Sequence, residues 1–246
     1  KHLVVIGGGA AGFFTAINAS AMSPGLKVTI LEKSSKLLSK VSVSGGGRCN
    51  VTHACFDIEE MIRKYPRGMH FVRKAFHRFF TRDTIAWFLE RGVALKTEDD
   101  GRMFPVTDTS STIVECLLKE AALHHVEIVT NAGVSAVEAA AGDGNTGFYL
   151  HIAGREKLFA DFVCVACGGY PKDARFEWIR ALGHTIHSPL PSLFTFNMPG
   201  NAVTALMGIS VPDAVVKIKG TNLKEQGPLL ITHWGMSGPV ILRLSA

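Results

Sequence analysis

Long apolar runs and a cysteine framework are both missing from this chain of 246 residues. No segment reaches the roughly 18 uninterrupted apolar residues that a membrane-spanning helix needs. The five cysteines are an odd number, and their spacing fits no disulfide framework of a secreted domain. These absences predict a protein without a membrane span that resides in a reducing compartment, and we therefore expect a cytoplasmic location.

Charged residues are also scarce, at 19% of the chain against 47% apolar residues, which excludes a disordered or fibrous protein. The net charge is nevertheless +5, and seven Lys or Arg residues fall between Arg63 and Arg82. Aromatic residues are interleaved with these cations, as in nucleic-acid-binding surfaces. A pair of amphipathic helices explains the segment better, because Phe76, Phe79 and Phe80 share a helical face and leave the cations to solvent. We therefore do not expect nucleic acid as a partner.

The N-terminal residues have the pattern of a βαβ unit. Residues 2–6 predict a buried strand, residues 10–22 a helix and residues 27–31 a second strand. Between the first strand and the helix lies Gly7-Gly8-Gly9-Ala10-Ala11-Gly12, a G-x-G-x-x-G string. This string indicates a dinucleotide-binding site where it follows a strand and begins a helix, as it does here.

Each glycine of the motif has a distinct predicted role. Gly7 permits a tight turn, Gly9 allows the backbone to approach a pyrophosphate, and Gly12 lets the helix pack close to the strand. The helix N–H groups, at Ala10 and Ala11, then face the phosphates. The motif therefore predicts a pyrophosphate site at the start of the helix.

An acidic residue completes the motif. Glu32 stands at the end of the second strand, twenty residues after Gly12, where its carboxylate can accept hydrogen bonds from an adenosine ribose. It would also repel a 2′-phosphate, so NADP is not expected at this site. A second copy of the glycine string, residues 142–147, precedes no helix and is predicted to be a hairpin turn.

Two further segments favour FAD over NAD. Ser44-Gly45-Gly46-Gly47-Arg48-Cys49-Asn50 combines closely spaced glycines with a cation and an amide, which suit a pyrophosphate and a flavin together. It lies within residues 33–52, which show no clear periodicity and predict a loop. Residues 162–169 predict a buried strand that ends in small residues and lets a ligand approach closely.

These segments resemble those of the YhiN/BaiN family of FAD-dependent oxidoreductases, which includes aminoacetone oxidases and bile-acid-pathway reductases. The most specific match is residues 44–52, and residues 101–105, 166–171 and 232–239 support it. The resemblance runs through the whole chain and implies FAD as the cofactor. From the motifs and the resemblance, the expected cofactor contacts are Gly7, Gly9, Ala10, Ala11, Gly12, Glu32, Lys33, Lys40, Ser44, Gly45, Gly46, Arg48, Cys49, Asn50, Val134, Ala166, Cys167, Gly168 and Gly169.

The pattern of helices and strands predicts two domains. Residues 1–188 are expected to form an α/β, Rossmann-like FAD-binding domain of the two-dinucleotide-binding flavoprotein type. It would carry a helical insertion at about residues 56–92 and a small antiparallel ribbon at about residues 134–160, with strands at residues 134–139, 148–152 and 158–160. Residues 189–246 are expected to begin a β-rich substrate domain of short strands and turns, with one turn at Pro212-Asp213. The family's C-terminal return segment is absent, so we expect a part of a longer protein that binds FAD weakly on its own.

The sequence offers few candidates for catalytic side chains. Cys49 and Cys55 are one residue too far apart for the redox pair of disulfide reductases. Cys164 and Cys167 lie in an apolar strand rather than at a helix N-terminus. We expect all four to be buried packing residues. His233 is a candidate proton donor beside the flavin, although a structural role in a helix-capping turn is the better interpretation.

Together these features predict a flavin-dependent oxidoreductase that acts on a small organic molecule, with NAD(P)H or oxygen as its redox partner and without a metal site. Flavin chemistry needs no side-chain nucleophile, because the cofactor carries the hydride or electrons. Two alternatives remain open. One is a flavin-dependent RNA-modifying or RNA-binding protein that uses the face between Arg63 and Arg82, and the other is a plain NAD-dependent dehydrogenase.

Overall fold

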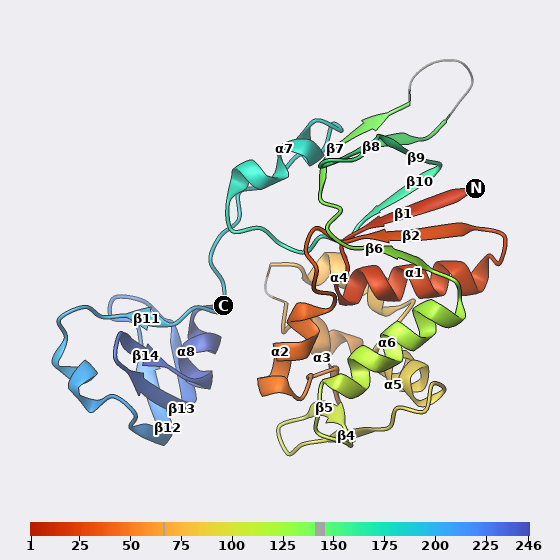
Figure 1. The fold of residues 1–246 in the computed structure, drawn as a ribbon. Coiled ribbons are helices and arrows are strands. Elements are labelled where there is room, and N and C mark those ends of the chain that lie inside the picture. The colour runs from red at the N-terminus through yellow and green to blue at the C-terminus, as the bar shows by residue number, and fades with distance from the viewer. Residues whose placement is uncertain (66, 141–145) are drawn as a thin grey trace. The chain divides into compact units, whose positions relative to one another are not determined.

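The computed structural model describes residues 1–65, 67–140 and 146–246. These residues form two compact units, Lys1–His187 and Ser188–Ala246 (Figure 1). The division falls one residue before the boundary that the sequence suggests. Most of the expected turn at residues 142–147 lies outside the described residues.

A four-stranded parallel sheet forms the centre of the first unit, in the order β10-β1-β2-β6 (Figure 1). Its strands are β1 (His2–Ile6), β2 (Lys27–Leu31), β6 (Glu127–Val129) and β10 (Phe162–Val165). β1 lies between β2 and β10, so the turn that follows β1 is flanked by the ends of two strands. Ligands of open parallel sheets bind at this carboxyl edge.

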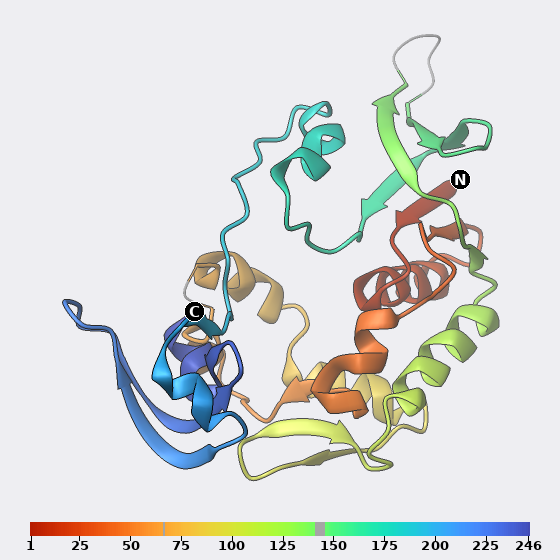
Figure 2. The same ribbon diagram turned by 60° about the vertical axis from the view of Figure 1, so that its left-hand side comes forward.

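Helices cover one face of this sheet (Figures 1 and 2). α1 (Ala10–Met22) and α6 (Ser111–Leu123) pack against each other there. α3 (Ile58–Ile62), α4 (Met69–Phe76) and α5 (Thr81–Leu89) follow one another in the stretch where the sequence predicts helices. None of the helices in the described residues has the length and apolar character that a bilayer crossing requires.

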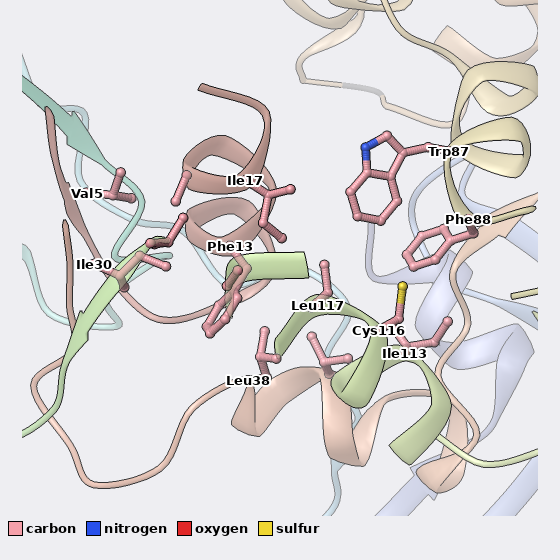
Figure 3. Close-up of a cluster of buried hydrophobic side chains, with 14 of the residues drawn as sticks. Val5, Phe13, Ile17, Ile30, Leu38, Trp87, Phe88, Ile113, Cys116 and Leu117 are labelled. Atoms are coloured by element: carbon pink, nitrogen blue, oxygen red, sulfur yellow. The ribbon is translucent and has the colours of Figure 1, made fainter. Parts of the chain in front are cut away.

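The largest buried cluster joins the sheet to these helices (Figure 3). Val5 and Ile30 are fully buried and belong to the same cluster as Phe13 of α1. Trp87 and Phe88 of α5 extend the cluster away from the sheet. Each buried side chain of this kind stabilises the fold by about 1.5–3 kcal/mol relative to its exposed state. The cluster therefore fixes α1, whose N-terminus adjoins the candidate site.

A three-stranded antiparallel ribbon covers the opposite face of the sheet. Its strands are β7 (Val134–Ala139), β8 (Phe148–Ile152) and β9 (Leu158–Ala160), with the bounds that the sequence predicts. Successive side chains of a strand point to opposite faces. Val4 and Ile6 of β1 therefore pack with the ribbon in a second buried cluster, whereas Val5 faces the helices.

Two smaller elements of the first unit lie outside the parallel sheet. β3 (Thr52–His53), β5 (Arg102–Pro105) and β4 (Leu95–Thr97) form an antiparallel sheet in that order. A 3₁₀ helix, Asp173–Phe176, leads into the short α7 (Glu177–Arg180). β3 begins two residues after Asn50 and so holds the end of the glycine-rich segment.

The second unit is β-rich. Its antiparallel sheet has the order β11-β14-β13-β12, followed by the short α8. Pro212 and Asp213, expected in a turn, instead lie inside β12 where the register with β13 shifts, because a bulge tolerates a residue without a donor. The elements are β11 (Phe196–Asn197), a 3₁₀ helix (Ala202–Leu206), β12 (Ser210–Lys217), β13 (Lys224–Thr232), β14 (Gly235–Ser237) and α8 (Pro239–Leu244).

Two expectations about the first unit are wrong. The predicted loop at residues 33–52 contains α2 (Ser39–Gly47), whose backbone leaves the helical region at Ser44 and the two glycines after it. Its first residues form a helical turn that is too short to show periodicity. β10, expected to be buried, has Phe162 46% and Val165 44% exposed, because it is the last strand of the sheet in the described residues.

Candidate cofactor-binding site

The turn between β1 and α1 depends on two of its glycines. Gly7 has φ +117°, and a Cβ there would lie 2.9 Å from the Cα of Cys167 at the end of β10. A Cβ on Gly12 would overlap the carbonyl oxygen of Gly7 and lie 3.1 Å from its carbonyl carbon. The first glycine therefore permits the turn and the second permits close packing of the helix, as the sequence predicts.

Gly9 has a different environment. It is the N-cap of α1 with φ −96°, and a Cβ there would meet no atom within 4 Å. Packing of the protein therefore does not require a glycine at this position, and the space in front of it is open. The first turn of α1 has no acidic residue, and no side chain caps it. The backbone N–H groups of Ala10 and Ala11 at this positive helix end suit an anion.

Glu32 is held at the side of this turn. Its Oε2 accepts a hydrogen bond of 2.8 Å from the Gly8 N–H, and its Oε1 accepts bonds of 2.9 and 2.8 Å from the N–H and hydroxyl of Ser34. Partial burial acts to raise the pKa of Glu32, but these hydrogen bonds outweigh it, and the net shift of the pKa is downward. A carboxylate has about four acceptor positions. Glu32 is therefore an ionised, oriented acceptor with room for a further donor.

A groove of about 630 Å³ runs along this edge of the sheet. Its walls combine the glycine turn, the end of β2, the start of α2 and the end of β10. Exposed Lys36 and Lys40 bring positive charge to it. Of the predicted contacts, the residues that line it are Gly7, Gly9, Ala10, Ala11, Glu32, Lys33, Lys40, Ala166, Cys167, Gly168 and Gly169.

A smaller pocket of about 440 Å³ lies beside the groove and shares Lys33 with it. Val134, a predicted contact, lines this pocket together with Tyr170 and Trp178. Burial, with a contribution from Cys167, raises the pKa of Tyr170 to about 12. The pocket combines the charged Lys33, Arg175 and Glu177 with the flat rings of Tyr170 and Trp178, and these rings suit an aromatic ring system such as adenine.

A third cavity of about 530 Å³ lies on the other side of the turn. It shares Ala10, Ala11 and Lys40 with the groove. Three predicted contacts, Ser44, Cys49 and Asn50, line it, and the rest of the lining is largely apolar. Fifteen of the nineteen predicted contacts thus line one series of adjoining hollows within the first unit, whereas Gly12, Gly45, Gly46 and Arg48 line none of the three.

The glycine-rich segment has a left-handed backbone at its glycines and is closely packed at Gly45. Gly45 has φ +57°, and a Cβ there would lie 2.7 Å from the ring of Phe104 and 2.9 Å from the Asn50 nitrogen. Gly46 also has a positive φ, +69°, but a Cβ there would meet nothing within 4 Å. Gly45 is therefore required by the fold, whereas Gly46 leaves open space for a ligand, as Gly9 does.

The role expected for Arg48 needs correction. The sequence analysis assigns its guanidinium to the ligand, but the structure pairs it with Glu98 and places it 4.0 Å from the ring centroid of Phe104. Asp108 lies 3.7 Å away. The hydrogen bond to Glu98 is the main cause of the upward shift in the pKa of Arg48. Arg48 thus fixes the glycine-rich segment to the β4–β5 hairpin, and Glu98 is a site residue that sequence reasoning missed.

The cysteines of the first unit differ from one another. Cys49 and Cys55 are each 6% exposed, which confirms the prediction of buried packing residues, and burial raises the pKa of the Cys49 thiol. Cys164 and Cys167 are only partly buried, so the prediction is wrong for them. In the described residues β10 is the last strand of its sheet, which leaves Cys164 partly exposed, and Cys167 lies two residues beyond the end of β10. All five cysteines are free thiols.

His233 belongs to the second unit. It forms, with Trp234, the two-residue turn between β13 and β14, and its side chain is exposed. Its ring lies 4.5 Å from that of Trp234 in an edge-on arrangement. The expected helix-capping role is therefore wrong, because α8 begins only at Pro239, after Gly238. Among the described residues, no three His, Cys, Asp or Glu side chains are grouped as metal ligands.

Comparison with known proteins gives matches along almost the whole chain. The sequence profile of the HI0933-like protein Rossmann domain matches residues 1–236. The chain is 30% identical over 250 residues to a ribosomal RNA dihydrouridine synthase of Haemophilus influenzae, covering 98% of this chain and 60% of that protein. It is 27% identical over 253 residues to a 3-dehydro-bile acid delta(4,6)-reductase of Clostridium scindens, covering 100% of this chain and 60% of that protein. The chain thus spans 60% of the length of these relatives.

Solved structures share the fold at lower identity. The open conformation of a flavocytochrome c3 fumarate reductase aligns with a TM-score of 0.53 and 21% identity over 70% of this chain and 34% of that protein. The 3-ketosteroid-delta4-(5alpha)-dehydrogenase of Rhodococcus jostii RHA1 aligns with a TM-score of 0.50 and 17% identity, over 71% of this chain and 47% of that chain. The predicted Rossmann-like α/β fold of the flavoprotein type is confirmed.

Proposed function

Because this chain belongs to the HI0933-like family of FAD-binding Rossmann domains, we propose that it is the cofactor-binding part of a reductase. The reaction is the saturation of a carbon–carbon double bond that is conjugated to a carbonyl group. FAD is the cofactor of the family, as the sequence predicts.

The names of the curated relatives share one kind of chemistry. A 3-dehydro-bile acid carries a ketone, and the delta(4,6) double bonds are conjugated to it. Formation of dihydrouridine adds hydrogen across the double bond of a uracil ring, which is conjugated to a ring carbonyl. In both reactions a hydride reaches the carbon far from the carbonyl and a proton reaches the carbon next to it. Reduced FAD supplies the hydride in such reactions.

The residues of this chain bind and orient the cofactor. The N–H groups of Ala10 and Ala11 donate to the pyrophosphate, and Lys40 adds a positive charge beside it. The remaining acceptor position of Glu32 receives a ribose hydroxyl. The pocket of Val134 takes the adenine. This assignment fits the open space in front of Gly9, which lines the groove.

The observation that carries the proposal is the apolar cavity beside the glycine-rich segment. It adjoins the pyrophosphate groove at Ala10 and Ala11, and has a volume of about 530 Å³. A flat, weakly polar ring system fits such a lining, and burial there excludes water from the reacting atoms. Cys49 in its wall stays a neutral thiol, because burial raises its pKa. Redox chemistry at this site therefore rests on the cofactor and not on a thiolate.

An anaerobic titration of the purified flavoprotein tests the proposal. NADH or NADPH should bleach the flavin absorbance, and a 3-keto-4-ene steroid or a uridine-containing RNA, added without oxygen, should restore it. Restoration by oxygen alone would contradict the proposal and favour an oxidase. Extraction of NAD instead of FAD from the protein would favour the plain dehydrogenase.

We also place the protein in the cytoplasm, which the five free thiols support. NAD(P)H is the proposed electron donor, because the reactions of both relatives consume electrons.

A further inference from the structure

One surface of the first unit has an unusual charge. Residues 63–82, here termed the basic surface, extend from the end of α3 through α4 to the start of α5. They contain seven Lys or Arg residues and no Asp or Glu. The cations with exposed side chains are Arg63, Lys64, Arg67, Lys74, Arg78 and Arg82.

Packing accounts only in part for the aromatic residues of the basic surface. α4 buries none of its side chains. The expected helical face of Phe76, Phe79 and Phe80 does not form, because α4 ends at Phe76 and Phe80 is the N-cap of α5, although the ring centroids of Phe76 and Phe80 lie 5.0 Å apart. Phe71, however, is 82% exposed and Tyr65 is 42% exposed. Tyr65 lies edge-on to Phe76, with ring centroids 5.8 Å apart, so packing accounts for part of its ring, whereas Phe71 has no aromatic partner among the described residues.

The cations of the basic surface also lack acidic partners. Among the described residues, Arg73 alone of these cations has an ion pair, at 2.7 Å from Glu59. Arg82 lies over the ring of Phe56 instead, 4.6 Å from its centroid. Most arginines elsewhere in the chain are paired with a carboxylate, namely Arg48, Arg91, Arg102, Arg180 and Arg243. Clustered, unpaired cations repel one another and attract a polyanion.

These properties select one kind of partner. A neutral protein surface would have to bury unpaired charges, which is costly. A duplex nucleic acid neutralises charge, but its bases stay stacked on one another and cannot stack on Phe71 and Tyr65. A single strand offers phosphates to the cations and unstacked bases to the exposed rings.

The basic surface also adjoins the candidate site. Phe79 packs against Phe14 of α1, with ring centroids 5.1 Å apart, and both line the apolar cavity beside the glycine-rich segment. Thr84 and Trp87 of α5 line the same cavity. A strand bound along α4 would therefore pass the wall of this cavity.

We propose that the basic surface binds single-stranded RNA, with phosphates on its cations and bases stacked on Phe71 and Tyr65. The choice of RNA rests on the proposed function, because uracil, a base of RNA, carries a double bond conjugated to a carbonyl without a methyl group on it.

Fluorescence anisotropy with a 5′-labelled, uridine-rich single strand tests the surface directly. The variant R67E/K74E/R78E should bind at least tenfold more weakly than the unchanged chain. Its slope of log K against log salt should be smaller by about 2, since each phosphate contact on a single strand contributes about 0.7. The matched control K119E/K219E/K224E changes three exposed, unpaired lysines elsewhere and the same net charge. It should bind almost normally.

The aromatic contribution has its own test. F71A should weaken binding by about tenfold, because stacking on one aromatic side chain contributes strongly to single-strand binding. L123A removes an exposed apolar side chain from α6 and should have no effect. Melting temperatures of all variants should match that of the unchanged protein, since none of the substituted side chains is buried.

Several results would overturn this proposal. Equal weakening by the two triple variants would show that RNA binding depends only on net charge and not on this surface. Equal affinity for a duplex would show that bases do not stack on the exposed rings. Equal affinity for a single-stranded DNA of the same sequence would remove the preference for RNA. Binding to anionic vesicles but not to RNA would identify a membrane surface instead.

Flavin turnover separates this proposal from the proposed function. The triple variant should still have its flavin reduced by NAD(P)H and reoxidised by a small enone. Absence of RNA binding together with enone reduction would refute the surface alone. RNA binding without reduction of either substrate would refute the proposed reaction alone.

Discussion

Substitution of two glycines of the same motif should affect two different properties, the stability of the protein and its affinity for FAD. Gly12→Ala places a methyl group on the carbonyl oxygen of Gly7, which is backbone and cannot rotate away. Gly9→Val places its side chain in open space at the N-cap of α1. The first change should therefore destabilise the protein itself, and the second should obstruct the pyrophosphate.

The magnitudes follow from these contacts. Overpacking of this kind costs about 1–3 kcal/mol, and α1 must move away from the buried cluster that Phe13 and Ile17 share with the sheet. For a protein of this size that corresponds to a Tm lower by about 2–12 °C. Gly9→Val loses at most about 1 kcal/mol as a poorer N-cap. Its Kd for FAD should rise by at least about tenfold, which corresponds to 1.4 kcal/mol.

Calorimetry of the flavin-free proteins and FAD titration followed by flavin fluorescence measure the two effects separately. Gly12→Ala should melt earlier than Gly9→Val in the absence of FAD, and Gly9→Val should bind FAD more weakly than the unchanged chain. If Gly9→Val bound FAD normally, the pyrophosphate would not lie at this turn. If Gly9→Val also lowered the Tm as much as Gly12→Ala, the reasoning from open space would be wrong.

Three further predictions concern the neighbouring residues. Glu32→Ala should raise the Kd for FAD by about 10- to 100-fold, since a charge-assisted hydrogen bond contributes about 1.5–3 kcal/mol. Because the pKa of Glu32 is lowered, its contribution should be constant at neutral pH and be lost as the pH falls through that pKa, which a titration of FAD binding against pH would show. Arg48→Ala should lower the Tm of the flavin-free protein, because Glu98 and Phe104 lose their partner. An unchanged Tm together with weaker flavin binding would indicate that Arg48 contacts the ligand after all. Cys49→Ser and Cys55→Ser should retain turnover, and its loss in either would indicate thiol chemistry.

Local sequence patterns predicted the parts of the fold that local physics decides. The bounds of β1, α1 and β2 match the predictions for residues 2–6, 10–22 and 27–31. Apolar periodicity and the glycine string are sufficient there, because the turn and the helix start depend on residues close in sequence. The ribbon strands were also predicted with their observed bounds, since each is short and bounded by turn residues.

Properties that depend on distant residues were not predictable in the same way. The exposure of Cys164 follows from the position of β10 in the sheet, and sheet order is set by pairing over more than a hundred residues. α2 begins after Leu38, a non-glycine residue with φ +52°, which no propensity scale favours. Pro212 indicated a turn, yet a bulge accommodates it within β12.

The two ends of the candidate site also differ in how well the sequence predicts them. Its pyrophosphate end is formed by one continuous βαβ unit, so its sequence signal is strong. Its flavin end is the glycine-rich segment, which is held by contacts with the β4–β5 hairpin: Gly45 packs on Phe104, and Arg48 pairs with Glu98, 50 residues away in sequence. The sequence therefore suggested that Arg48, a cation beside glycines, contacts a ligand, whereas in the structure it pairs with Glu98 within the protein. The backbone of the glycine-rich segment therefore depends on this hairpin, whereas the turn between β1 and α1 does not.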